Sequence, residues 1–197
     1  MKNVKFETVQ NSINAAFDTR IASASNDNMK AFLTKMHKSF CAINAAQSKA
    51  LYALDIDLIA LSNRIEVSDA SSSEFIAQYA LEKVIKTCKA LASGSASALD
   101  KYTFSIVKNL NELQKLDNLN TQRTLCSKIE LSEFAQEQAV KVYHNCSPST
   151  ASTQASSTRM MLQALNICNV TKRAKNDAIS FAETESAKAL QEMLAIA

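Results

Sequence analysis

With one glycine, Gly94, and one proline, Pro148, among 197 residues, the chain holds few of the residue types that form tight turns. Hairpins and glycine-rich phosphate-binding loops depend on these residues, so sheets and nucleotide-binding folds are hard to build here. Alanine, the strongest helix former, is abundant. We therefore predict an all-α protein, a bundle of about six or seven amphipathic helices joined by short Ser, Asn and Asp loops.

The most regular hydrophobic pattern lies between residues 28 and 65. Apolar side chains recur there at intervals of three and four residues, from Met29 to Ile65, and no glycine or proline interrupts them. The pattern predicts one unusually long helix over about residues 28–65, roughly 55 Å in length.

Further helices are predicted on both sides of this segment. One covers about residues 4–24, and the next starts after a capping box formed by Ser71 and Glu74. A fourth helix carries the apolar face from Leu99 to Leu113. Residues 121–144 are expected to be helical in one or two pieces.

The C-terminal part begins with the clearest loop of the sequence, around Pro148. Residues 149–159 are rich in Ser, Thr and Ala, which suits either a weakly anchored helix or a flexible segment. One or two helices are expected to close the chain. We expect residues 1–146 to form the main bundle and residues 147–197 a C-terminal segment packed on the same core.

A row of small side chains runs beside the apolar stripe of the predicted long helix. Its members recur every seven residues: Ser39, Ala46, Ala53 and Ala60. Small side chains let a neighbouring helix approach closely, either within the monomer or at a contact between subunits. These four residues are therefore a candidate interface.

The charge distribution gives no general case for nucleic-acid binding. The net charge is only +3, and acidic and basic residues are interspersed along most of the chain. Two basic clusters are weak candidates for nucleic-acid contacts: Lys83, Lys86 and Lys89, and then Lys172, Arg173 and Lys175. A solvated charged face is the simpler interpretation of both clusters.

The second basic cluster overlaps a sequence motif. Residues 162–175 resemble a helix-turn-helix, with Asn166 at the turn. Lys172 departs from that motif, because it stands where the second helix needs an apolar anchor.

The sequence predicts no catalytic, cofactor or metal site. His37 and His144 are the only histidines, and the five cysteines lie too far apart for a zinc motif. His144 and Cys146 are close in sequence, but side chains two residues apart on a helix point to different sides. We expect five free thiols in a reducing compartment, and no enzyme activity.

No segment reads as a signal peptide or a membrane span. Residues 51–61 are the most apolar stretch, but Asp55 and Asp57 interrupt it and it is too short to span a bilayer. The expected location is the cytoplasm or an intracellularly assembled particle.

The sequence favours a non-enzymatic structural or adaptor protein that works through helix surfaces in a larger assembly, such as a virion or a bacterial scaffold. Its partners would be copies of itself or other assembly subunits. The alternative is a nucleic-acid-associated accessory protein that uses the basic faces of the third and seventh helices. The partner, the oligomeric state and the biological process stay open at this stage.

Overall fold

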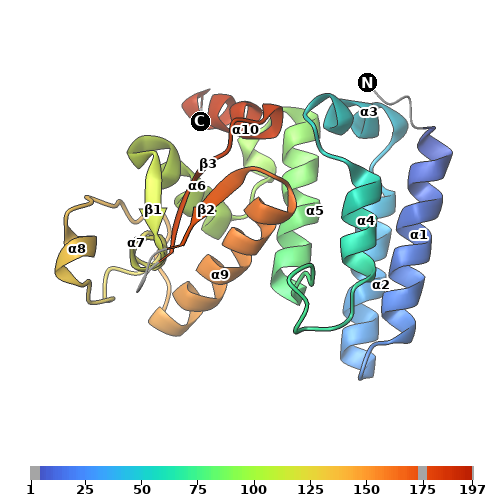
Figure 1. Cartoon of the computed structure of the whole chain (residues 1–197), viewed down its shortest axis with the longest axis horizontal. Coiled ribbons are helices and arrows are strands. Elements are labelled where there is room, and N and C mark those ends of the chain that lie inside the picture. Colours follow the sequence, from blue (N-terminus) through green and yellow to red (C-terminus); the bar gives the residue numbers. More distant parts are fainter. Residues whose placement is uncertain (1–4, 173–176, 197) are drawn as a thin grey trace.

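The protein is mostly helical, as predicted, but it also contains a small antiparallel sheet (Figure 1). The computed structural model describes residues 5–172 and 177–196, without the side chain of Phe134. The helices are α1 (Phe6–Ala22), α2 (Asp27–Cys41), α3 (Ala45–Ala53), α4 (Leu58–Glu66), α5 (Gln78–Ser93), α6 (Lys101–Leu113), α7 (Asn118–Arg123), α8 (Glu133–Gln136), α9 (Pro148–Ala164) and α10 (Glu185–Ile196), with a 3-10 turn, η1 (Ala96–Ala98). The strands are β1 (Lys115–Asp117), β2 (Cys168–Thr171) and β3 (Ala178–Phe181).

The prediction of one long helix over residues 28–65 is wrong, because α2, α3 and α4 occupy that stretch. Polar side chains start each new helix. Asn44 accepts a hydrogen bond from the backbone N–H of Gln47 and forms a full capping box with it. Asp57 caps the first turn of α4, and Asp55 just before it adopts a left-handed conformation with a φ of 60°. All three helices bury their apolar faces in one core, so the apolar period continues across both breaks.

A buried arginine ties the N-terminal helices together. Arg20 of α1 is only 6% exposed, and its guanidinium donates hydrogen bonds to the carbonyl oxygens of Ile65 and Ile76. These two acceptors lie at the end of α4 and just before α5. The guanidinium also sits 5.0 Å from the ring centroid of Phe75. Arg20 therefore satisfies one carbonyl of α4 and one in the loop that carries the predicted capping box, and α5 begins only at Gln78.

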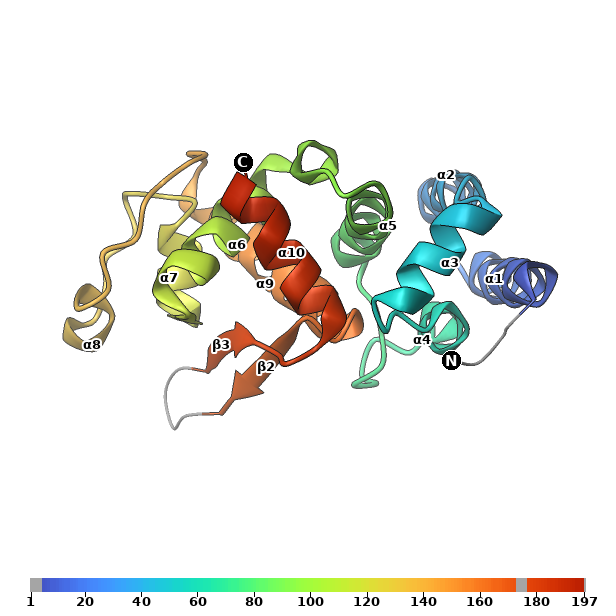
Figure 2. The same ribbon diagram turned by 90° about the horizontal axis from the view of Figure 1, so that it is seen from above.

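Helix α5 stands in the middle of the molecule, between α1–α4 and the C-terminal elements (Figures 1 and 2). It packs against α2 and α3 on one side and against α9 on the other. One continuous core cluster includes side chains from both regions, among them Phe17, Leu81 and Leu162. In the part of the chain that the structure describes, no helix is long and apolar enough to cross a membrane.

The C-terminal elements differ most from the sequence prediction. After α9, Asn166 takes a left-handed conformation and a β-hairpin of β2 and β3 follows, so the predicted closing helix, α10, begins only at Glu185. Strand β1 pairs with β3, so the sheet order is β1-β3-β2 and all neighbours are antiparallel. The helix-turn-helix resemblance over residues 162–175 is therefore wrong, because β2 stands where the second helix of that motif would lie.

Two further stretches, residues 149–159 and residues 121–144, differ in how much helix they contain. Residues 149–159 are helical, because Ser147 caps α9 and Pro148 occupies its first turn, where no N–H donor is needed. The predicted helix over residues 121–144 is wrong, since only α8 and the end of α7 are helical there. Hydrogen bonds between Asn109 of α6 and the backbone of Lys141 hold part of this segment instead.

Candidate nucleic-acid interface

Helix α9 presents one polar, outward-facing stripe along its whole length. The seven positions of the stripe are Ser149, Ser152, Thr153, Ser156, Arg159, Met160 and Gln163, each exposed or half-buried. The opposite side of α9 is buried, with Ala151, Thr158 and Leu162 fully covered. The helix has seventeen residues and is about 25 Å long, and the stripe covers nearly all of it. Such a face can offer hydroxyl, amide and guanidinium groups to a long ligand.

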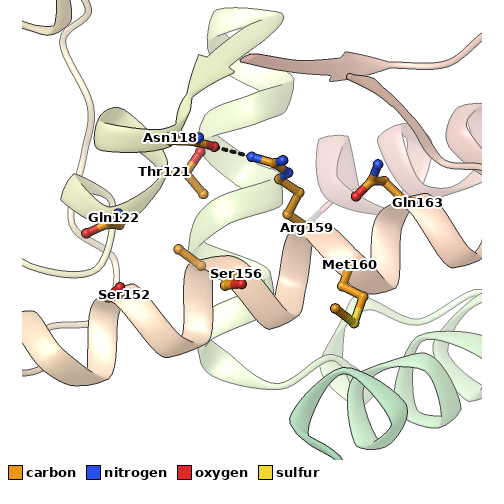
Figure 3. Close-up of a pocket in the computed structure, with 9 residues that line it drawn as sticks. Asn118, Thr121, Gln122, Ser152, Ser156, Arg159, Met160 and Gln163 are labelled. Carbon is orange, nitrogen blue, oxygen red and sulfur yellow. Dashed lines mark hydrogen bonds between the residues drawn. The ribbon is translucent and has the colours of Figure 1, made fainter. Parts of the chain in front are cut away.

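A cavity of about 300 Å³ lies between this stripe and α7 (Figure 3). Arg159 is its one charged lining residue. The guanidinium donates one hydrogen bond to the Asn118 amide oxygen, at the start of α7, and a second to the Asp177 carboxylate, at 3.0 Å. The backbone N–H of Asn118 in turn donates to the carbonyl of Asp177. Arg159 therefore joins α9, α7 and the start of β3 at one point.

Three of the remaining polar side chains of the stripe are available for a ligand. Within the described residues, the hydroxyls of Ser152 and Ser156 and the amide of Gln163 make no hydrogen bond to the protein. Figure 3 shows these side chains following one side of α9, next to the cavity. Exposed hydroxyls and amides that no intramolecular partner uses can bind phosphates or base edges without first breaking a protein contact.

The segment that holds this face is more basic than the rest of the chain. Residues 101–181 contain ten Lys and Arg against six Asp and Glu, a net charge of +4, so the remaining residues carry a net charge of −1. Lys172, directly after β2, is exposed. The other two members of its predicted cluster, Arg173 and Lys175, lie outside the described residues.

The three lysines of α5 do not form a free basic face. Lys83 is 4% exposed and forms an ion pair with Asp100 at 2.8 Å. Lys86 pairs with Glu82 at 2.8 Å, and Lys89 donates to the Ser39 hydroxyl at 2.9 Å. The lysine spacing identified one side of a helix, but the neighbouring elements cover most of that side.

Burial and the ion pair act in opposite directions on the pKa of both Lys83 and Asp100. Burial lowers the pKa of Lys83, and the charge of Asp100 acts in the opposite direction. For Asp100, burial acts to raise the pKa, but the Lys83 ammonium and hydrogen bonds from Lys83 and Thr103 outweigh it and hold the pKa below its usual value. Both groups are therefore charged at neutral pH, and Lys83 has a structural role.

The four predicted interface residues lie on three separate helices. Ser39 belongs to α2 and is half-buried under Lys89, whereas Ala46 and Ala53 are exposed on α3. Ala60 is exposed on α4, beside a second cavity of about 250 Å³. Their seven-residue spacing followed a continuous helix that does not exist. A subunit contact at any of these positions stays a prediction.

The His144–Cys146 pair is not assembled as a catalytic site. His144 packs edge-on against the Tyr102 ring, with centroids 4.9 Å apart. The Cys146 thiol instead faces the carbonyl oxygen of Leu125 at 3.5 Å, and burial raises its pKa. Among the described residues, no group of three or more His, Cys, Asp and Glu side chains is placed to hold a metal ion.

Comparison of the chain with models of known protein families, with curated proteins and with solved structures found no match. Function is therefore inferred from the geometry of the chain itself.

Proposed function

We propose that the protein binds double-stranded DNA and that the polar stripe of α9 lies in the major groove. The observation that carries this proposal is the order and packing of the C-terminal elements. Helix α9 packs against both α6 and α7, β1 lies between α6 and α7 in the sequence, and the β2–β3 hairpin follows α9 directly. The sheet order β1-β3-β2 joins the hairpin back to β1.

This order of elements is that of a winged helix-turn-helix. In helix-turn-helix proteins the second helix of the pair enters the major groove while the first crosses the DNA backbone. Here α7 takes the place of the first helix and α9 that of the second. The chain departs from the simple motif in one respect, because residues 124–147 replace the usual short turn between the two helices.

The side chains of the stripe suit this placement. Serine and threonine hydroxyls bind phosphates and base edges, arginine pairs with guanine, and glutamine pairs with adenine. The first half of α9 exposes small residues, Ser149, Ser152 and Ser156, which let the helix backbone come close to the bases. Arg159 and Gln163 follow in the second half, where longer side chains reach further across the groove.

The modest charge of this region predicts how non-specific and specific contacts contribute to the affinity for DNA. A net charge of +4 over residues 101–181 neutralises few phosphates, so non-specific affinity should be weak and should depend on salt. Specific affinity would then come mainly from hydrogen bonds made by the α9 stripe. Asp177 pairs with Arg159 in the free protein, so DNA must compete with this carboxylate for the guanidinium.

The test is fluorescence anisotropy with a labelled random-sequence DNA duplex at several salt concentrations. The wild-type chain should bind at low salt and lose affinity as salt rises. Ser156→Glu places a negative charge at the centre of the stripe and should weaken binding at least about tenfold, roughly 1.4 kcal/mol. Ser73→Glu, the same change at an exposed serine outside the stripe, in the loop before α5, is the matched control and should leave affinity unchanged.

Two outcomes would contradict the proposal. One is a wild-type chain that binds no duplex DNA even at low salt. The other is equal binding by Ser156→Glu and Ser73→Glu, which would place the contact elsewhere. Both serines are exposed, so circular dichroism should show the same helix content and melting temperature for the two variants as for wild type.

A further inference from the structure

A second surface, away from the α9 stripe, gathers three of the four tyrosines of the protein. We call it the tyrosine surface and define it by Tyr79, Tyr102, Phe104, Tyr143 and His144. Tyr79 is 52% exposed and Tyr143 41% exposed, which is unusual for large apolar side chains in this chain. The rings are arranged edge to face, with centroids of Phe104 and Tyr143 6.2 Å apart.

An apolar groove of about 490 Å³ opens on this surface. Its lining includes Leu99 and Phe104 from one side and Tyr143 and His144 from the other. Aromatic side chains, tyrosine above all, are enriched where proteins bind one another, because they bury a large area at a small cost in conformational entropy. A groove of this size accepts one or two large apolar side chains.

Several hydrogen bonds and an ion pair hold the outer wall of the groove in place. The Tyr143 hydroxyl donates to the Glu112 carboxylate at 2.6 Å, and this hydrogen bond raises the pKa of Tyr143 to about 12. Glu112 also pairs with Lys141 at 3.3 Å, and the Lys141 backbone is bound by Asn109 of α6. Because the wall is already ordered, a ligand loses little free energy in fixing it.

The groove carries one positive charge that no acidic side chain in the described part of the chain neutralises. Lys101 lines it and is exposed, with its ammonium 5.4 Å from the centroid of the Tyr102 ring. Among the described residues Lys101 has no ion pair, whereas Lys83 and Lys141 each have an acidic partner. Burial and the charge of Lys101 both lower the pKa of His144, so the imidazole is neutral at pH 7. The complementary ligand is apolar with a single carboxylate.

We infer that the tyrosine surface binds a segment of a partner protein that carries a large apolar side chain next to an Asp or Glu. The apolar side chain fills the groove between Leu99, Phe104 and Tyr143, and the carboxylate pairs with Lys101. This gives a specific form to the adaptor role that the sequence favours, and it does not depend on DNA binding.

The tyrosine surface and the α9 stripe can be occupied together. Gln154 of α9 lines a smaller cavity beside Tyr79 and Tyr102. Ser156, in the stripe, is two residues further along the helix, which turns it by about 200° to the opposite side. A protein partner and a DNA duplex would therefore approach this helix from different directions.

The test starts with random 12-residue peptides displayed on phage and selected against the immobilised full-length chain. Enriched peptides should share a large apolar residue within a few positions of an Asp or Glu. A labelled peptide of this group should bind Lys101→Glu and Tyr143→Ala at least tenfold more weakly than wild type. Lys128→Glu, another exposed lysine without an ion pair in the described chain, is the matched control and should bind normally.

Reversing the charge on the peptide as well as on the protein tests whether the two charged groups are in contact. Replacing the acidic residue of the peptide by lysine should restore binding to Lys101→Glu and weaken binding to wild type. Lys101 is the first residue of α6, where an acidic side chain suits the helix dipole, so the variant should fold. The inference is overturned if no peptide is enriched, or if the selected peptides bind Lys101→Glu as tightly as wild type.

Discussion

Replacing Lys83 by methionine tests whether this lysine has a structural role. Lys83 has a side chain that is 5% exposed, and its ammonium lies 2.8 Å from the Asp100 carboxylate and 3.1 Å from the Thr103 hydroxyl. Methionine fills a similar volume without the charge. The substitution therefore removes the ion pair between α5 and the start of α6 with little change in packing.

The structure sets the size of the expected loss. Removing one partner of a buried ion pair costs roughly 3–5 kcal/mol, because the other charge is left buried and unpaired. Asp100 is 14% exposed and keeps hydrogen bonds from the backbone N–H groups of Tyr102 and Thr103. We therefore expect Lys83→Met to lower the free energy of unfolding by about 3 kcal/mol. In a protein of this size the melting temperature should fall by roughly 6–12 °C.

The dependence on pH follows from Asp100. Its pKa in the folded protein lies below the usual value, so the pair stabilises the protein above about pH 4 and stops doing so as pH falls through the folded pKa. The difference between wild type and Lys83→Met should therefore be complete at pH 7 and shrink as the pH drops below about 4.

Urea unfolding at pH 7 and at pH 3 measures both effects. Lys86→Met is the control, because Lys86 forms an exposed pair with Glu82 that is worth at most about 0.5 kcal/mol. The double variant Lys83→Met/Asp100→Ser keeps a capping hydroxyl and removes the buried charge, so it should recover much of the loss. A loss below about 1 kcal/mol for Lys83→Met at pH 7 would refute the reasoning.

Three further predictions concern other parts of the chain. Gly94 ends α5 at a φ of +64°, and a Cβ there would meet no atom within 4 Å, so Gly94→Ala should cost only the backbone strain of about 1–2 kcal/mol in urea unfolding. Burial raises the pKa of Cys88 and Cys168 to about 12, so a thiol reagent at pH 8 should modify Cys41 well before either, and should titrate five thiols after denaturation without reductant. Ala53 is exposed, so Ala53→Leu should change stability by less than about 0.5 kcal/mol, and a fall in mass by light scattering would assign this residue to a subunit contact.

The apolar stripes were the predictable part of the fold. Val9, Ile13 and Phe17 are buried as their spacing predicts, and the stripe of α2–α4 faces the core throughout. The breaks within that stripe were harder to locate, because Asn44 and Asp57 fit equally well on the outside of a helix. The Asn44–Gln47 spacing was the one local signal of a new helix start.

The sheet and the candidate site depend on contacts that sequence patterns do not contain. Each strand has three or four residues, too few for an alternating pattern, and β1 finds its partner far along the chain. The Ser- and Thr-rich composition of residues 149–159 was visible, but its meaning depends on which side of α9 the neighbouring helices cover. Lys83 shows the opposite difficulty. Its spacing with Lys86 and Lys89 indicated an exposed face, but an ion pair with Asp100, at the start of α6, keeps it buried.

The pairing of β1 with β3 also sets an order of events for the folding chain. The β2–β3 hairpin closes a short loop, whereas Lys115 must meet Ser180 across all of α7, α8 and α9. Closing a longer loop costs more chain entropy, so we expect this pairing to form late, after β3 has been synthesised. Leu116, which pairs with Ile179 of β3, is fully buried in the folded protein. The sheet is therefore completed by one of the last segments of the described chain, and pulse-labelled hydrogen exchange at Leu116 and Ile179 would time that step.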